Sequence, residues 1–317
     1  MPFLPVGGQA VLEGVMMRAP SKIAVVVRRP DGTTESMQRP FQSVTQRHPL
    51  LRLPVVRGAA SLFETMFLGI SALNFSADVA ARDEHPAAGE AAKPPGKGFA
   101  VVQGLTVMFS LAMGALLFVV LPARATPLLQ HALGFNGRAG FGLIDGALRL
   151  TVFVLYLLLI SQWKEMARVL GYHGAEHKAI HAIEAGVELI PENVQKFSRL
   201  HPRCGTTFLF IVVLISIVAF TIIGRPDGIG PHLLRIACMP LIAGIAFEFI
   251  RLSGKYYEVP FVRVITWPGM QFQRLTTREP DLAMCAVAIE SLKLVLDDPT
   301  VIKLQHQPGR PEMSFVQ

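Results

Sequence analysis

The sequence predicts an α-helical integral membrane protein with four transmembrane helices, an interfacial or re-entrant helix, and a small N-terminal β-hairpin unit. Its 317 residues are 51% hydrophobic and only 17% charged, whereas soluble domains carry about a quarter charged residues. The hydrophobic residues gather in four long runs, and the segments around these runs are alternately rich and poor in Lys and Arg. Together these observations predict a multi-pass membrane protein.

The net charge of +7 fits basic loops that face the cytoplasm and anionic lipid head groups. We therefore expect membrane lipids as partners and no nucleic acid. The three cysteines, Cys204, Cys238 and Cys285, are few and far apart, so they predict no disulfide framework.

Residues 1–57 predict a cytoplasmic β unit. The β-branched run Ile23–Val27 is a strand, and residues 33–37 return as a second strand after a Pro-Asp-Gly turn. The segment Gly7–Arg18 is rich in glycine but lacks the phosphate-loop pattern. It is either the start of a strand or a loop that carries polar side chains into a site near the membrane surface. The polar side chains concerned are those of Gln9, Glu13 and Arg18.

Residues 58–98 predict an interfacial helix and a linker. The run Gly58–Ala77 is nearly all apolar, interrupted by Glu64 and Asn74. As a fifth span it would place the eight basic residues before it outside, against the positive-inside rule. We therefore favour a helix that lies in the interface or re-enters the membrane. Residues 83–98 are rich in Ala, Pro, Gly and charge, which is typical of a flexible linker.

Two pairs of transmembrane helices are predicted in residues 99–162 and 206–250, because a span needs about 20 mostly apolar residues. The four predicted spans are Gly104–Leu121, Leu143–Gln162, Thr206–Ile223 and His232–Phe249. We expect the first to end at Pro122. Asp145 and Arg149, four residues apart, can pair on one face of the second.

The basic residues set the direction of these helices. Lys and Arg number eight in residues 1–57, two in 123–142, six in 163–205 and one in 225–231, and the tail is basic again. This alternation predicts a bacterial inner (plasma) membrane protein with both termini in the cytoplasm.

Residues 251–317 predict a cytoplasmic C-terminal region. We expect a turn with an interfacial aromatic residue at Trp267–Gly269 and an amphipathic helix at Asp281–Leu296. Glu248, at the inner end of the fourth span, either pairs with Arg251 or belongs to a functional cavity.

The cytoplasmic loop 163–205 carries the residues best suited to chemistry. At 100° per residue, five of its side chains share one helical stripe: His173, Glu176, His177, His181 and Glu184. Two histidines four residues apart on a helix can bind one metal ion. Residues 173–177 also match the H-x-x-E-H pattern, in which the glutamate acts on the catalytic water.

The end of this loop offers a third ligand for a tetrahedral site. Either Cys204 or His201 could complete the site, and Glu184 and Glu248 are further candidates. The donor types predict a divalent metal, zinc, with Glu176 as the general base. Without a metal, the same stripe is a polar, hydrogen-bonded helix on the cytoplasmic surface.

Four stretches distributed over nearly the whole chain carry a resemblance: Gly7–Arg18, Tyr172–Lys178, His201–Thr206 and Leu275–Pro280. In these stretches the chain resembles the YqhQ-like family of bacterial polytopic membrane proteins, which carry a domain of unknown function and are often labelled predicted metal-dependent enzymes. The resemblance implies a membrane protein with metal-dependent chemistry, and it supplies neither a substrate nor an established catalytic residue.

The leading hypothesis is an integral inner-membrane protein with a metal site at its cytoplasmic face, acting as a hydrolase on a lipid or membrane-adjacent substrate. The alternative is a non-enzymatic scaffold, or an oligomeric channel or lipid-handling protein. In the alternative, the His/Glu helix is a packing or subunit contact. A homo-oligomer is compatible with both hypotheses.

Overall fold

A computed structural model describes residues 4–84, 97–135, 137–224, 228–257, 259–299 and 301–302. Most of the linker predicted at residues 83–98 lies outside the described residues. The chain divides into two compact units. Unit 1 comprises residues 1–83, 160–210 and 243–317, and unit 2 comprises residues 84–159 and 211–242.

Unit 1 contains a four-stranded antiparallel sheet with the strand order β1-β2-β3-β4. The strands are β1 (Gly7–Val11), β2 (Gly14–Arg18), β3 (Lys22–Arg28) and β4 (Thr34–Pro40). The hairpin predicted from residues 23–37 is confirmed as β3–β4. The segment Gly7–Arg18 is a second hairpin, and its tight turn holds Glu13 at a φ of 50°.

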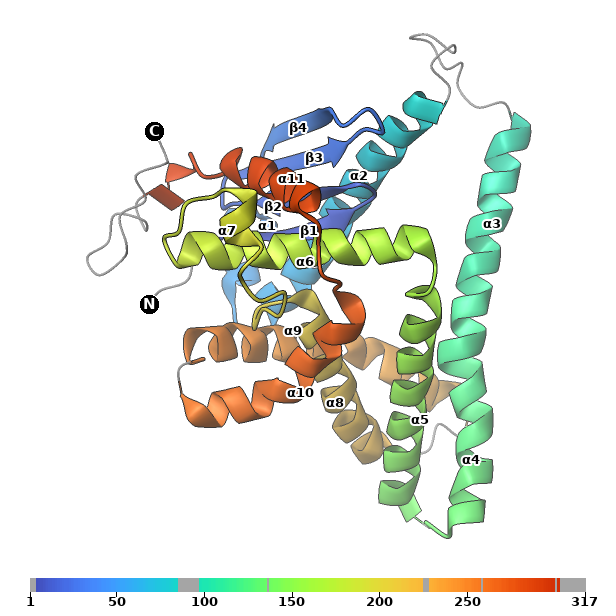
Figure 1. Cartoon of the computed structure of the whole chain (residues 1–317). Coiled ribbons are helices and arrows are strands. Elements are labelled where there is room, and N and C mark those ends of the chain that lie inside the picture. Colours follow the sequence, from blue (N-terminus) through green and yellow to red (C-terminus); the bar gives the residue numbers. More distant parts are fainter. Residues whose placement is uncertain are drawn as a thin grey trace. The chain divides into compact units, whose positions relative to one another are not determined.

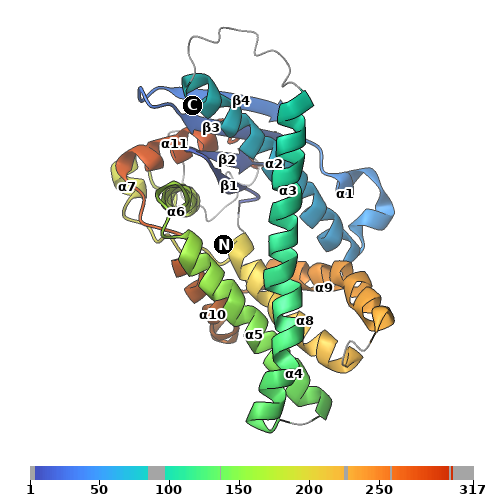
Figure 2. The ribbon, with the colours of Figure 1, turned by 90° about the vertical axis from the view of Figure 1, so that its right-hand side faces the viewer.

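Helices cover both faces of this sheet (Figure 1, Figure 2). Alternate residues of a strand point to opposite faces. Met17 and Val26 therefore face one hydrophobic core, which they share with residues of α6 (Lys164–Glu184) and α11 (Leu282–Lys293). On the opposite face, Met16 and Val25 pack with residues of α2 (Val56–Glu84).

The other described helices continue the chain in order. They are α1 (Val44–Arg47), a 3₁₀ turn (Pro49–Arg52), α3 (Lys97–Ala115), a π-helical turn (Leu116–Val120), α4 (Leu121–Leu133), α5 (Gly137–Ile160), α7 (Pro191–Val194), α8 (Gly205–Ile223), α9 (Ile229–Lys255) and α10 (Pro260–Thr276). The helix predicted at Asp281–Leu296 is confirmed as α11, and the Asp281 side chain caps its start by accepting a hydrogen bond from the Met284 amide.

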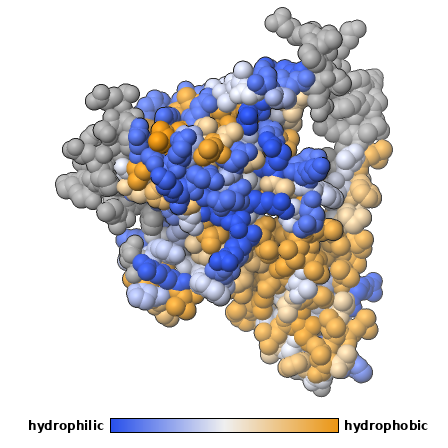
Figure 3. Space-filling model, in the orientation of Figure 1, coloured by the Kyte–Doolittle hydropathy of each residue, from blue (hydrophilic) through white to orange (hydrophobic). Residues whose placement is uncertain are grey.

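Among the described residues, five helical segments are long and apolar enough to cross a membrane. They are Val56–Asp83, Met108–Leu133, Gly137–Ile160, Gly205–Ile223 and Leu233–Lys255. Four of them overlap the predicted spans, and the other one is α2. Figure 3 shows hydrophobic side chains gathered over α4 and α5, where Leu128 and Leu159 are exposed.

Two expected helix breaks are wrong. The first apolar helix does not end at Pro122, because the π-helical turn leads directly into α4. Pro122 lies in the first turn of α4, where the missing N–H of proline is tolerated. No turn forms at Trp267–Gly269. This segment lies within α10, and Gly269 lets Thr207 approach the helix closely.

Unit 2 is held together by close helix contacts and a charged cluster. Glycines at positions 142 and 146 of α5 make room for Thr221 and Ile217 of α8. The predicted pair of Asp145 and Arg149 is confirmed, with a distance of 2.9 Å from Nε to Oδ2. Arg235 of α9 lies 3.9 Å from the same carboxylate, so Asp145 joins α5 to α9.

Candidate metal centre

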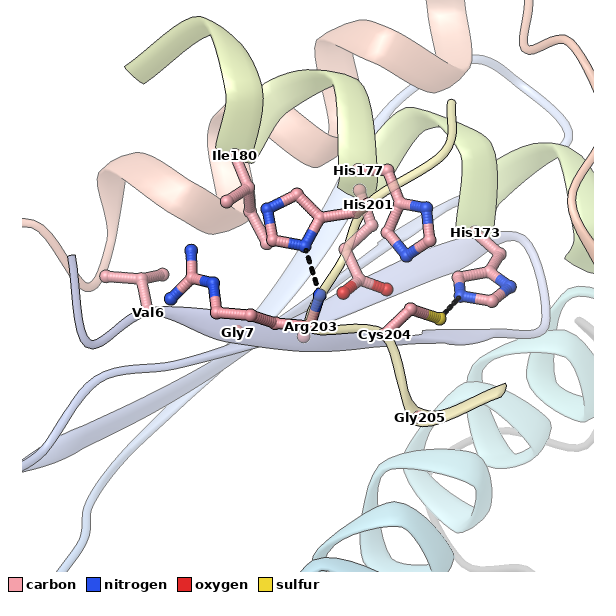
Figure 4. Close-up of a pocket in the computed structure, with 11 residues that line it drawn as sticks. Val6, Gly7, His173, His177, Ile180, His201, Arg203, Cys204 and Gly205 are labelled. Carbon is pink, nitrogen blue, oxygen red and sulfur yellow. Dashed lines mark hydrogen bonds between the residues drawn. The ribbon is translucent and has the colours of Figure 1, made fainter. Parts of the chain in front are cut away.

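The candidate site lies in unit 1, where α6 meets the turn that leads into α8. His173 and His177 lie one helical turn apart on α6, and their ring centroids are 4.5 Å apart. The Cys204 thiol faces them from the turn (Figure 4). One ligand atom from each of these three residues lies within 4.8 Å of the other two. The structure therefore brings together two of the predicted imidazoles and the predicted thiol.

Main-chain carbonyls fix the orientation of both imidazoles. His173 Nδ1 lies 2.7 Å from the carbonyl oxygen of Thr276, and His177 Nδ1 lies 2.6 Å from that of Arg199. A carbonyl oxygen can only accept a hydrogen bond, so each Nδ1 carries a proton and donates it. Nε2 is then the nitrogen of each ring that is left to bind a metal. Histidine ligands of metals are typically oriented in this way.

Cys204 and His173 interact strongly. The thiol sulfur lies 3.2 Å from His173 Nε2. Burial favours the neutral thiol, but the imidazoles of His177 and His173 together hold the pKa of Cys204 well below its ordinary value. Burial alone would lower the pKa of His173, whereas its interactions with Cys204 raise it to about 9. The metal-free site therefore favours a thiolate beside an imidazolium, which releases a proton when a metal binds.

Glu176 is the buried carboxylate next to these donors. It is 5% exposed, and its Oε2 atom has no hydrogen-bond partner among the described residues. The Gly8 main-chain N–H of β1 donates a hydrogen bond to this carboxylate. Burial raises the pKa of Glu176, and the imidazoles of His177 and His173 offset only part of this effect.

Gly8 permits the close approach of Glu176 to the sheet. A Cβ atom at position 8 would lie 3.0 Å from the Glu176 side chain and 2.5 Å from the Met16 carbonyl oxygen, and both distances are too short for an unstrained contact. At Gly7 an added Cβ atom would meet no atom within 4 Å. Of the two adjacent glycines, Gly8 is therefore required for space, and Gly7 is not.

A cavity of about 120 Å³ opens beside these groups. It is lined by Val6, Gly7, Gly8, His173, Glu176, His177, Ile180, His201, Arg203, Cys204 and Gly205. Two imidazole nitrogens and a thiolate suit zinc, and a site with three protein ligands keeps one position open. The free Oε2 atom of Glu176 is a buried acceptor that an ion or a water held in this cavity could satisfy. The residues present therefore fit a metal.

His201 belongs to a second group, with His181 and Glu184, whose ligand atoms also lie within 4.8 Å of one another. Arg203 forms an ion pair with the Glu184 carboxylate. A guanidinium at this position disfavours a second cation. His201 Nδ1 accepts a hydrogen bond from the Arg203 amide at 3.3 Å. Its Nε2 is buried with no hydrogen-bond partner among the described residues, and the Glu184 carboxylate lies 3.7 Å from it.

Three other predicted site residues lie away from the histidines. Glu13 pairs with Arg168 at the opposite end of β1, and Arg18 pairs with Glu64 of α2 at 3.1 Å. The Gln9 side chain packs against Gly69 of α2, on the other face of the sheet. The hairpin therefore reaches the site through the main chain of Gly8 rather than through these polar side chains.

Glu248 is also remote from the histidines. Its carboxylate accepts a hydrogen bond of 2.6 Å from the Arg57 guanidinium, and Arg251 lies 4.0 Å away. An ion pair accounts for this residue, with Arg57 as the closer partner.

The site is supported by groups that no sequence motif marks. Gln273 of α10 is fully buried. Its side chain accepts a hydrogen bond from the His201 amide at 2.7 Å and donates one to the His201 carbonyl oxygen at 2.6 Å. Because α10 carries several other polar residues, the sequence held no signal that singled out Gln273. The supporting carbonyl groups have no sequence signal, because every residue carries one.

Comparison with known proteins places these features in a family. The family described as "Protein of unknown function (DUF1385)" matches residues 53–298. The chain is 31% identical over 297 residues to "Uncharacterized protein YqhQ" of Bacillus subtilis (strain 168), and the alignment covers 92% of each chain. No solved structure matches. The matched range includes α6, the Cys204 turn and α11, and the chain belongs to the DUF1385 family, in which it is YqhQ-like.

Proposed function

We propose that the chain is an inner-membrane protein that crosses the bilayer four times and holds a metal ion in unit 1. The number of crossings follows from one hydrophobic core. Leu4, Tyr172 and Leu292 belong to the same core, although they lie in the N-terminal, central and C-terminal parts of the chain. Members of one core must lie on the same side of a membrane. The chain therefore crosses an even number of times between β4 and α6, and again between α6 and α11.

Of the three apolar segments between β4 and α6, α2 is the one that does not cross. Its residues Ala72 and Val79 are buried in the core beneath the sheet. The Glu64 carboxylate accepts hydrogen bonds from Ser43 at 2.9 Å and from the Val44 amide at 2.7 Å. A further set of apolar α2 side chains is exposed: Leu62, Phe63, Met66, Phe67, Ile70 and Leu73. This pattern supports an interfacial helix.

The direction of the spans rests on charge. With four spans, the segments that join unit 1 are those rich in Lys and Arg, and the segments at the opposite ends of the spans are poor in them. The positive-inside rule then assigns unit 1 and both termini to the cytoplasm.

In this proposal His173, His177 and Cys204 hold a divalent metal, zinc by donor type. The single observation that carries it is the paired donation of Nδ1 protons to main-chain carbonyls, which presents two Nε2 atoms next to one thiol of low pKa. Bound zinc would supply a Lewis acid. The Oε2 atom of Glu176, which accepts no hydrogen bond from Gly8, would accept a proton from water. The reaction class is hydrolysis of a lipid or membrane-adjacent substrate.

Metal content tests the site directly. The purified full chain should contain near-stoichiometric zinc, and its cobalt form should show a sulfur-to-cobalt charge-transfer absorption. Cys204→Ser should abolish that absorption and His177→Ala should lower the metal content, whereas the matched changes Cys238→Ser and His131→Ala should leave both unchanged. Substoichiometric zinc, iron and manganese that do not respond to His177→Ala would overturn the metal proposal.

Hydrolysis is tested separately. Glu176→Gln should keep the zinc but lose hydrolysis of phosphatidylethanolamine–phosphatidylglycerol vesicles. If wild type releases no product from these vesicles while zinc is bound, a lipid hydrolase is excluded for these lipids, and a non-enzymatic membrane protein becomes the better hypothesis.

A further inference from the structure

Helix α10 has its polar and apolar faces reversed relative to a helix that meets water. Its buried residues include Thr266, Gln273 and Thr276, which are at most 7% exposed. Phe261 and Val264, by contrast, are 70% and 71% exposed. A helix on a water-facing surface buries its apolar stripe and exposes its polar one. The exposed face of α10 therefore needs an apolar environment.

The two faces are distinct in angle. At 100° per residue, Thr266, Gln273 and Thr276 fall within about 80° of one another. Phe261, Val264 and Ile265 form a second stripe next to them. Trp267, 61% exposed, lies beside this apolar stripe, as interfacial tryptophans do.

The position of α10 in the chain points to lipid as the partner of this face. Helix α10 begins at Pro260, directly after the apolar segment Leu233–Lys255 ends. The exposed cations Lys255, Arg263 and Arg274 lie near it, and they complement anionic head groups.

We propose that α10 lies in the cytoplasmic head-group and acyl-chain boundary of the bilayer and anchors the candidate metal centre at the membrane surface. The proposal rests on the membrane topology proposed above. The buried face of α10 makes the anchor, because the Thr276 carbonyl holds His173 and the Gln273 side chain holds the main chain of His201. A substrate with a lipid head group is then the class within reach of the site.

Tryptophan quenching tests this placement, because the chain has two tryptophans, Trp163 and Trp267. In the full-length Trp163→Phe variant, reconstituted in vesicles, the emission comes from Trp267 alone. Brominated acyl chains should quench it strongly, and aqueous iodide should quench it weakly. The reference is Thr33→Trp in a chain that lacks both native tryptophans, because it reports the exposed turn before β4. Iodide should quench this residue strongly, and brominated acyl chains should quench it weakly.

Each other outcome overturns the proposal. Strong iodide quenching of Trp267 would mean that α10 meets water. Shielding from both quenchers would mean that protein covers it, from a second copy or another segment. If Trp163→Phe folds poorly, wild type is compared with Trp267→Phe, which keeps Trp163, and the difference between the two quenching curves gives the quenching of Trp267. Carbonate extraction separates the placement of α10 from the proposed spans. If the chain stays in the membrane but iodide quenches Trp267, only the placement of α10 is refuted. If carbonate extracts the chain, the four-span topology is refuted.

Discussion

Gln273→Ala should destabilise unit 1 strongly, because Gln273 is a buried side chain that satisfies two main-chain groups. Its removal leaves the His201 N–H without this partner, and His201 is only 4% exposed. The His201 carbonyl oxygen loses one hydrogen bond but still accepts another from the Cys204 amide at 3.3 Å. One unsatisfied buried group costs about 1–3 kcal/mol, so the free energy of unfolding of unit 1 should fall by about that amount.

Proteolysis of the folded protein in detergent measures this loss, since cleavage follows the population of the open form when opening is fast. A loss of about 2 kcal/mol raises that population roughly 30-fold. Gln271→Ala, a half-buried residue of the same helix, is the matched control and should change the cleavage rate little. A cleavage rate for Gln273→Ala within threefold of wild type would show that the His201 turn does not depend on α10, and the reasoning would fail.

Three further predictions address the sheet, the topology and pH. Gly8→Ala should displace Glu176, so this variant should keep the zinc content of wild type but hydrolyse substrate more slowly. Gly7→Ala is the control and should change neither the zinc content nor the rate. Equal rates for the two variants would contradict the role of the Gly8 contact. The cysteine of Asn74→Cys should not react with an impermeant thiol reagent added outside, and reaction from outside would favour a fifth span. Reporter fusions after residue 135 should lie outside, and fusions after residue 300 should lie in the cytoplasm. Burial raises the pKa of Cys285 to about 11. Between about pH 9 and 11 the thiol therefore keeps its proton in the folded state and loses it in the unfolded state. The contribution of Cys285 to the free energy of unfolding should decline over this pH range. Cys285→Ala should flatten that decline, which pH-dependent proteolysis would detect.

The sequence predicted the elements whose signal is local. The period of α6 placed His173, Glu176 and His177 on one stripe without any tertiary information, because helical geometry alone sets the stripe. The β3–β4 hairpin was also predictable, since residues 30–32 carry turn chemistry between two strand-forming runs. The hairpin of β1 and β2 was harder to assign, because its turn uses Leu12 and Glu13 in place of the usual Gly or Asn.

The parts that sequence could not decide depend on contacts between distant segments. The sequence left His201 and Cys204 as alternatives, whereas the structure places the Cys204 thiol beside His173 and His177 through the turn after α7, whose His201 main chain is hydrogen-bonded to Gln273. The continuation of the first apolar helix past Pro122, by contrast, has a local cause, a π-helical turn that residue preferences do not reveal.

The shared core of unit 1 has a consequence for the order of biosynthesis. The Ser21 amide, in the turn before β3, donates a hydrogen bond to Asp298, 277 residues later. Helix α11 can therefore pack on the sheet only after this part of the chain has left the ribosome. At about 5–20 residues per second, the first two hairpins wait roughly 14–55 s before α11 joins α6 in covering this face of the sheet. In the proposed four-span topology, both pairs of spans enter the bilayer during this time, and a single reversed pair would leave α6 or α11 on the far side. In that proposal, the candidate metal centre is complete only when the whole chain has been inserted correctly, and a chaperone that shields the N-terminal strands during synthesis would act before His173, His177 and Cys204 meet.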